Sequence, residues 1–245
     1  MKPIWCILCY VIHLISANKS MLSHGSAFRI AGGTEAVEGQ APYQCSMQKY
    51  GTHFCNCAII SDEFVLSAAH CIGNKQPKNV DIVMGTNGRN GTVFKAKRFI
   101  KHDKYRTSPS LMYDIGLVEV QGTIQFNDKI QAIKYAQRDT QVPDGTTLLV
   151  SGWGWLGSFI TPPNRLHVLY VTAISYQQCK ESWPKVHEGC LCTMNKIGEG
   201  TCYGDSGGPM VWGDTLVGLV SYGEPCATEL ETCIFRTLHF WTRED

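Results

Sequence analysis

The sequence has little net charge and few charged residues. Its formal charge is +1 over 245 residues, and charged side chains make up only 18% of the chain. A balance so close to neutral provides no long-range field for nucleic acid or for anionic lipid. Binding to nucleic acid or to a membrane surface is therefore not expected, and partners should be selected by shape and local contacts.

A hydrophobic run long enough to cross a membrane is also lacking. The apolar segment at residues 4–15 follows Lys2 and ends in small residues. A spanning helix needs about 20 apolar residues, so this segment is too short for an anchor. A basic start, a short apolar core and small residues at its end are typical of a secretory signal. We predict a signal peptide over residues 1–17 and a secreted, extracellular protein.

Internal repeats and low-complexity segments are absent as well. A hydrophobic content of 44% and 24 glycines suit one large or two small β-rich units. Apolar or alternating runs bounded by Gly, Pro, Asn or Asp are typical of strands, and they cover residues 58–60, 80–84, 147–150, 168–174 and 216–221. Helical periodicity is limited to residues 176–180 and the C-terminal residues. The pattern predicts an all-β fold.

One glycine-rich segment, GDSGGP at residues 204–209, surrounds a single serine. Glycine lets the main chain turn sharply and approach a substrate closely. The backbone amides of Gly204 and Ser206 are then candidates to bind a developing oxyanion. In isolation the segment is also compatible with a plain surface turn. Partners elsewhere in the chain must decide between the two interpretations.

A serine hydroxyl is a weak nucleophile that needs a base and a third group to orient that base. His70 ends a run of small and apolar residues at 65–69, and Asp114 opens the apolar run 114–118, where an unpaired carboxylate would be costly. Taken alone, each is typical of a framework residue. Together, in the order His, Asp, Ser, they predict His70 as general base, Asp114 as its orienting partner and Ser206 as nucleophile.

This order and four motifs resemble the trypsin/chymotrypsin family of serine endopeptidases. The motifs are Ala68-Ala69-His70-Cys71, Asp114-Ile115-Gly116-Leu117, Ser151-Gly152-Trp153-Gly154 and the GDSGGP segment. The resemblance runs from Ile30 to about Trp241. It implies two six-stranded antiparallel β-barrels with the active site in the cleft between them, and a short C-terminal helix.

The same resemblance implies the function and the domain organisation. A protease domain would span residues 30–245, with the boundary between its barrels at about 129–143. It would hydrolyse protein or peptide substrates through an acyl-enzyme intermediate. We expect a monomer without a cofactor, subject to protein inhibitors.

A polar leader at residues 18–29 ends in Arg29 and precedes Ile30. The resemblance implies that this leader is an activation propeptide removed by an activating protease. Cleavage would free the α-amino group of Ile30 to pair with Asp205. A buried carboxylate beside the oxyanion turn needs such a countercharge. Ala31 stands where the family usually has valine, a mild change in packing.

Cysteine pairing is expected in a secreted chain. Removal of the signal peptide takes Cys6 and Cys9 and leaves ten of the twelve cysteines, an even number. The resemblance implies the pairs Cys55–Cys71, Cys179–Cys192 and Cys202–Cys226.

Four cysteines remain. Cys45 and Cys57 lie symmetrically about Gly51 in a predicted hairpin, and would bridge if register brings their Cα atoms within about 7 Å. Cys190 and Cys233 are left by elimination, as a bridge or as two buried thiols.

Substrate choice in the family depends on a residue six positions before the nucleophile, here Gly200. An acid at that position would pair with substrate Lys or Arg, and none is present. Residues 221–223 (Ser221, Tyr222, Gly223) match the strand that pairs with substrate backbone, and Gly223 leaves the pocket open to bulky groups. We therefore expect cleavage after large apolar or aromatic residues. Residues 198–202, which include Thr201, resemble the pocket region of arthropod chymotrypsin-like digestive enzymes.

Two departures from the family pattern keep alternatives open. Asn56-Cys57 replaces a pair of glycines near the cleft, and Thr232-Cys233 replaces proline and glycine in a pocket wall. They leave room for a weak homologue that acts as a binding protein, although the complete triad argues against it. A cascade protease of narrow specificity is the other alternative to a digestive enzyme.

Two further features concern ligands and modification. The segment 85–94 contains no carboxylate, so the calcium site of some relatives is not expected there. Asn90-Gly91-Thr92 and Asn18-Lys19-Ser20 are glycosylation sequons, and the sequence alone does not decide their occupancy.

Overall fold

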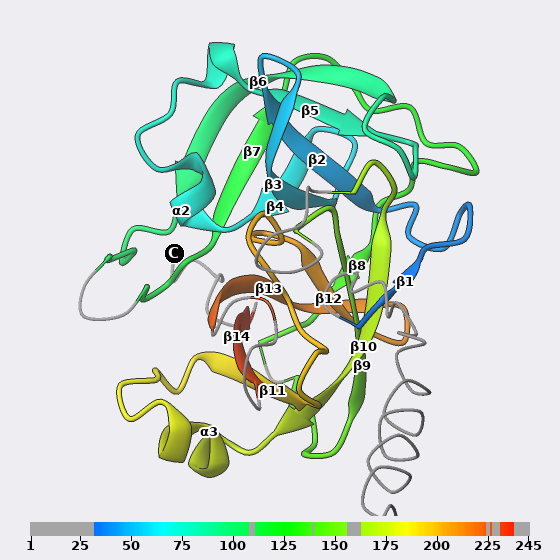
Figure 1. Ribbon diagram of the computed structural model, residues 1–245. Coiled ribbons are helices and arrows are strands. Elements are labelled where there is room, and N and C mark those ends of the chain that lie inside the picture. The colour runs from blue at the N-terminus through cyan, green and yellow to red at the C-terminus, as the bar shows by residue number, and fades with distance from the viewer. Residues whose placement is uncertain are drawn as a thin grey trace, which may run out of the picture.

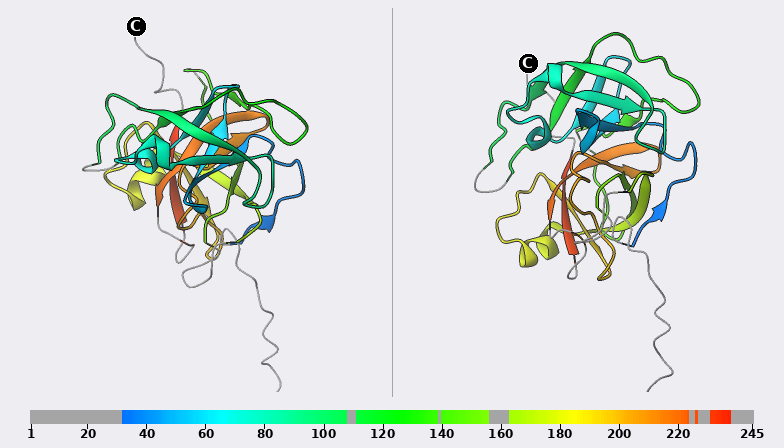
Figure 2. Two further views of the ribbon diagram at one scale, coloured as in Figure 1. Left: turned by 90° about the horizontal axis from the view of Figure 1, so that it is seen from above. Right: turned by 45° about the horizontal axis from the view of Figure 1, so that its top comes forward.

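Two β-rich halves are stacked one above the other in the molecule (Figures 1 and 2). The computed structural model describes residues 32–107, 111–138, 140–155, 163–223, 226 and 231–237, the last segment as backbone only. The predicted signal peptide, the propeptide and the C-terminal helix lie outside these residues. Strands make up 43% of the described chain and helices only 8%, which confirms the all-β prediction.

The upper half in Figure 1 is a closed antiparallel barrel. Its six strands are β2 (Gln44–Lys49), β3 (Thr52–Ile59), β4 (Phe64–Ser67), β5 (Asp81–Met84), β6 (Thr92–Lys101) and β7 (Gly116–Val120). They follow one another around the barrel in the order β2-β3-β4-β7-β6-β5. The turn between β2 and β3 has positive φ at both Tyr50 and Gly51, 52° and 74°. Positive φ at both central residues is the geometry of a tight two-residue hairpin.

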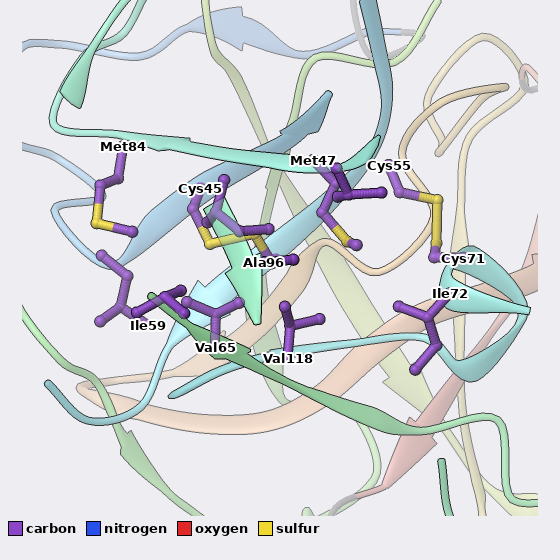
Figure 3. Close-up of a cluster of buried hydrophobic side chains, with 14 of the residues drawn as sticks. Cys45, Met47, Cys55, Ile59, Val65, Cys71, Ile72, Met84, Ala96 and Val118 are labelled. Carbon is purple, nitrogen blue, oxygen red and sulfur yellow. A yellow bond between two sulfur atoms is a disulfide. The ribbon is translucent and has the colours of Figure 1, made fainter. Parts of the chain in front are cut away.

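The core of this barrel is made of side chains that point inward from every strand. Met47, Ile59 and Val118 are among those with no exposed surface, and Figure 3 shows them packed around the disulfides. One of these disulfides joins Cys45 to Cys57, which are direct cross-strand partners with Cα atoms 4.9 Å apart. The condition stated for this bridge, Cα atoms within about 7 Å, is therefore met.

The lower half is built on an eight-stranded sheet. Its strands are β1 (Thr34–Glu35), β8 (Lys134–Tyr135), β9 (Thr147–Gly152), β10 (His167–Ile174), β11 (Cys190–Asn195), β12 (Pro209–Trp212), β13 (Thr215–Gly223) and β14 (Glu231–Thr237). Strand β9 pairs with both β10 and β12, so the path β9-β10-β11-β14-β13-β12 returns to its start. The two-barrel architecture is thus confirmed.

Short helices complete the described chain: α2 (Ala69–Ile72), the 3₁₀ helix η1 (Pro77–Asn79) and α3 (Tyr176–Ser182). Helix α3 confirms the helix predicted at 176–180. It begins at Ser175, whose Oγ accepts a hydrogen bond from the Gln178 N–H at 3.1 Å and so caps the first turn.

An apolar cluster joins the two barrels. Ala58, Leu66 and Ile115 from the first barrel are packed with Leu216 and Leu219 from the second, and all are buried. Burial of this kind favours a fixed relation between the halves. The groups that each half contributes to the candidate site therefore keep their relative positions.

The three disulfides that the family resemblance implies are all present: Cys55–Cys71, Cys179–Cys192 and Cys202–Cys226. The remaining pair is not set up for a cross-strand bridge, because β14 places Cys233 opposite Thr193 and Arg236 opposite Cys190. Of the two alternatives left by elimination, this register does not support the bridge. None of the helices in the described part of the chain has the length and apolar character that a membrane span requires.

Candidate active site

His70 and Asp114 meet at the end of the first barrel that faces the second. His70 lies in α2, and its Nδ1 is 2.7 Å from Oδ2 of Asp114. The His70 backbone N–H also donates to Asp114 Oδ1 at 2.8 Å, and the Ser221 hydroxyl donates to Oδ2 at 2.6 Å. The carboxylate is fully buried. With Nδ1–H committed to Asp114, the ring keeps Nε2 as its proton acceptor.

Backbone geometry delivers Asp114 to this position. The preceding residue, Tyr113, has φ of 51°, which is uncommon for a residue with a side chain. Its ring is stacked on His102 with centroids 4.8 Å apart. The chain therefore turns sharply just before the carboxylate and then enters β7. Such turns are typical of functional sites, where the surrounding structure holds the strain.

Ser206 lies in the loop that leads into β12, and this loop leaves two amides unused. The N–H groups of Asp205, Gly207 and Gly208 donate to the carbonyls of Cys202, Val220 and Asp205. Across the described residues, no acceptor takes the N–H of Gly204 or of Ser206. Gly204 has φ of 92°, a conformation that favours glycine. These two amides are the pair predicted to bind an oxyanion.

Two adjacent residues of β3 hold the base and the nucleophile near one another. Cys55 is bridged to Cys71, the neighbour of His70, and Asn56 N–H donates to the Ser206 carbonyl at 2.8 Å. His70 and Ser206 therefore flank the same short piece of chain. No direct hydrogen bond joins their side chains among the described contacts, and such bonds are often long before substrate binds.

Comparison with known proteins agrees with this geometry. A family model described as Trypsin matches residues 30–239. "Trypsin theta" of Drosophila melanogaster is 32% identical over 236 residues, which cover 91% of this chain and 89% of the relative. "Chymotrypsin-2" of Vespa crabro is 34% identical over 213 residues, covering 86% and 96%. The solved structure of neuropsin, a serine protease expressed in the limbic system of mouse brain, superposes with a TM-score of 0.79 at 27% identity, covering 86% and 95%.

The chain belongs to the trypsin family. It is a serine endopeptidase, and its substrates are proteins or peptides. Relatives of both names, trypsin and chymotrypsin, are similar to it at nearly the same level. Family membership therefore leaves its primary specificity to be argued from the pocket.

Asp205 of this trypsin-family domain lies in a sealed site beside the oxyanion loop. Its two carboxylate oxygens accept the N–H groups of Gly154 at 2.8 Å and of Cys202 at 2.9 Å. Burial raises the pKa of Asp205 to about 7, against the opposing effect of those hydrogen bonds. A Cβ at Gly152 or Gly154 would collide with the carboxylate, so the SGWG motif is glycine-rich for lack of space.

The chain that follows the predicted activation site runs close to the pocket region. A Cβ at Gly32 would collide with the Glu199 side chain and the Gly198 carbonyl. Arg29 and Ile30 lie outside the described residues. The first described residue after them is thus already in contact with the segment that leads to Gly200.

The pocket residues predicted from sequence lie in the segment before Cys202 and in β13 and β14. Gly200 and Thr201 are buried, and Ser221 begins the segment Ser221–Gly223 at the end of β13. Backbone pairing places Cys233 opposite Gly223, so β14 forms a wall beside this segment. None of these pocket residues carries an acid. Tyr222 is packed edge to face on Trp183, with centroids 6.0 Å apart.

The prediction from sequence missed three polar residues of the site: His53, Gln44 and Ser46. His53 Nε2 donates to the Gly204 carbonyl at 3.0 Å, and its Nδ1 is 2.8 Å from the Ser46 hydroxyl. Burial lowers the pKa of His53 to about 4. No spacing signal connects His53 with Gly204, because the two residues are 151 positions apart in the sequence. Only the period-two alternation of β2 would have pointed to Gln44 and Ser46, which lie on the face opposite the core residues Cys45 and Met47.

One group of potential metal ligands occurs in the described part of the chain: Cys55, His70 and Cys71. The two cysteines are bonded to each other and offer no thiolate. The histidine is already engaged with Asp114. This group carries no metal proposal.

Proposed function

We propose that this endopeptidase acts through His70 as general base, Asp114 as its orienting group and Ser206 as nucleophile. The observation that carries the proposal is the commitment of the buried Asp114 carboxylate to His70. The unused amides of Gly204 and Ser206 support the same assignment.

The reaction would proceed in two halves. Ser206 Oγ attacks the scissile carbonyl while His70 Nε2 takes the hydroxyl proton, and the oxyanion is bound by the amides of Gly204 and Ser206. His70 then gives its proton to the leaving amine, which departs and leaves an acyl-enzyme. Water enters, loses a proton to His70 and releases the acid by the same route. Asp114 stays ionised and stabilises the imidazolium.

The pocket favours a large apolar or aromatic side chain before the scissile bond. Gly200 occupies the floor position without a carboxylate, so a substrate cation would find no partner there. The aromatic contact between Tyr222 and Trp183 supports an apolar lining. Within this proposal, Thr201, Ser221, Gly223 and Cys233 form the remaining walls.

The protein is proposed to be made as a secreted zymogen. A signal peptide at residues 1–17 and a propeptide at 18–29 precede the protease domain at 30–245, whose barrels divide at about 129–143. An activating protease cuts after Arg29, and the new amino group of Ile30 pairs with Asp205. The burial of Asp205, which has no ion-pair partner within the described chain, supports this step. We propose a monomeric digestive enzyme open to protein inhibitors.

The test is to cleave the purified precursor after Arg29 and to profile hydrolysis of a peptide library, with the Ser206→Ala precursor treated identically. Ser206-dependent cleavage of many sequences after large apolar residues is the expected result. Cleavage of one partner alone would favour a cascade protease. Cleavage after Lys or Arg would overturn the pocket assignment. No Ser206-dependent turnover would leave only a binding protein.

A further inference from the structure

The carbonyl oxygen of Gly204 accepts two side-chain hydrogen bonds. His53 Nε2 lies 3.0 Å from it and Asn56 Nδ2 lies 2.8 Å from it, and both donors come from β3. A carbonyl oxygen has two lone pairs, so both are occupied here. Gly204, whose N–H is one of the two candidate oxyanion donors, is therefore held at its carbonyl by two side chains of the first barrel.

The preceding peptide unit is held as well. The Tyr203 carbonyl accepts the Trp155 N–H at 2.7 Å. In a planar trans peptide the carbonyl and the N–H point in opposite directions. Fixing the Tyr203 carbonyl on Trp155 therefore fixes the direction of the Gly204 N–H. The peptide units on both sides of the Gly204 Cα are thus held by hydrogen bonds.

One chain of hydrogen bonds leads to Gly204 through a titratable group. Gln48 Nε2 donates to the Ser46 hydroxyl at 3.3 Å, Ser46 contacts His53 Nδ1 at 2.8 Å, and His53 donates to Gly204. This order requires a neutral imidazole that accepts at Nδ1. Protonation of His53 would disturb the bond to Ser46.

A second chain reaches the same carbonyl without any titratable group. The Ser151 hydroxyl donates to Gln44 Oε1 at 2.7 Å, Gln44 Nε2 donates to Asn56 Oδ1 at 3.0 Å, and Asn56 Nδ2 donates to Gly204. The side chains of Ser151, Gln44 and Asn56 are all buried. The chain crosses from β9 of the second barrel to β2 and β3 of the first. It fixes the Asn56 amide so that its NH₂ points at Gly204.

We propose that Asn56 is a positioning residue for the oxyanion hole, which aims the Gly204 amide by holding the Gly204 carbonyl. The inference rests on the proposed function, because it presumes that the amide binds an oxyanion. With glycine at position 56, as in the family pattern, His53 would be the only side chain on this carbonyl. The departure near the cleft therefore does not fill the cleft, since Asn56 is fully buried and turned toward the loop.

This role acts on the transition state and predicts a specific kinetic signature. The cleaved Asn56→Gly protein should lose about tenfold in kcat with little change in KM, a smaller loss than the 100-fold or more that follows removal of an oxyanion donor itself. A peptide aldehyde, which forms a tetrahedral adduct on the serine, should bind more weakly by the same factor. A non-reactive peptide competitor should bind as before.

Asn87→Ala is the matched control. Asn87 is a second buried asparagine, and its Nδ2 donates to the Ala36 carbonyl at 2.8 Å and not to the oxyanion loop. Its loss should lower stability without lowering kcat. Gln44→Leu is a second test variant, because it removes the shorter of the two hydrogen bonds to Asn56 Oδ1 and leaves the longer one, from the Trp153 N–H at 3.4 Å. It should lower kcat in the same direction by a smaller factor.

Hydrogen exchange of the segment 203–208 provides a readout that needs no activity. Faster exchange there in Asn56→Gly, and not in Asn87→Ala, supports the proposal. If the wild type shows Ser206-dependent turnover and Asn56→Gly loses no more kcat than Asn87→Ala, the positioning role is wrong while the proposed function stands. If the wild type shows no turnover, the proposed function is wrong, and unchanged exchange in Asn56→Gly would refute the positioning role as well.

Discussion

The hydroxyl of Ser221 donates a hydrogen bond to Oδ2 of Asp114 at 2.6 Å, on the same oxygen that receives His70 Nδ1. A residue of the second barrel thus completes the environment of a carboxylate from the first. Among the described residues, three donors reach the buried carboxylate, counting the backbone N–H of His70. Any change at Ser221 therefore reaches the base through Asp114.

Ser221→Ala should lower kcat/KM by about tenfold, because a hydrogen bond to a charged group contributes about 1.5–3 kcal/mol and two donors remain. Steady-state kinetics on an apolar peptide substrate measures the effect. Ser175→Ala is the control: it removes the cap of α3, which costs about 1 kcal/mol of stability, and should leave kcat/KM unchanged. Equal kinetic losses in both variants would contradict the role assigned to Ser221.

The pKa of Asp205 predicts how stability depends on pH before activation. Burial raises this pKa to about 7 from the ordinary value of 3.8. Between those values the folded protein binds the proton more tightly than the unfolded chain, so stability falls as pH rises from about 4 to about 7. An uncleavable Arg29→Gln precursor should show this fall. The cleaved protein should show less of it, because the Ile30 ammonium would favour the charged carboxylate.

Thermal unfolding of both proteins across this pH range measures the difference. The pKa of His53 is lowered to about 4 from 6.5, so His53 makes stability rise with pH between these values. This contribution is the same in the cleaved and uncleaved proteins and cancels when their profiles are compared. Replacing Asp205 by Asn in the precursor should remove the fall in stability that Asp205 causes as the pH rises. Parallel profiles for the cleaved and uncleaved proteins would show that Asp205 gains no countercharge on cleavage.

Loss of either disulfide of the first barrel should lower stability by a similar amount, but only one of the two losses should lower activity. Cys45–Cys57 and Cys55–Cys71 close segments with separations of 12 and 16 residues. Removal of either by double alanine substitution should therefore cost about 3 kcal/mol, the loop-entropy value for this size. Only the second bridge holds α2 and His70. Loss of Cys55–Cys71 should lower kcat, measured well below the melting temperature, and loss of Cys45–Cys57 should not.

The pocket floor can be tested by adding the missing charge. Gly200→Asp should raise cleavage after Arg or Lys by about tenfold to 100-fold, since a charge-assisted hydrogen bond contributes about 1.5–3 kcal/mol. It should also lower stability, because Gly200 is buried and the new carboxylate is unpaired without substrate. Gly200→Asn is the uncharged control. If both variants keep the wild-type preference, the floor of the pocket lies elsewhere.

Local patterns explain what could be predicted from the sequence. The strands, α3 and the Cys45–Cys57 bridge depend on neighbours within one element or one hairpin. The positions of His70, Asp114 and Ser206 were predicted because each lies in a short motif with its own signature. In the structure Asp114 carries the donors that such a role requires.

Long-range register explains what could not be predicted. The contacts of Asn56 and His53 with Gly204 join residues 148 and 151 positions apart. They exist only once the two barrels have closed and docked. The pairing of β11 with β14 likewise separates Cys190 from Cys233 by three positions of register. Counting unpaired cysteines contains no information about that offset.

Two adjacent residues of β3 are linked to both sides of the candidate active site. Cys55 is bonded to Cys71 beside His70, and Asn56 is hydrogen-bonded to the loop of Ser206 through its backbone N–H and its side-chain amide. A shift of one barrel against the other would strain the contacts of Asn56 with Ser206 and Gly204, while the disulfide keeps His70 with the first barrel. The spacing between the base and the nucleophile therefore depends on two adjacent residues of one strand.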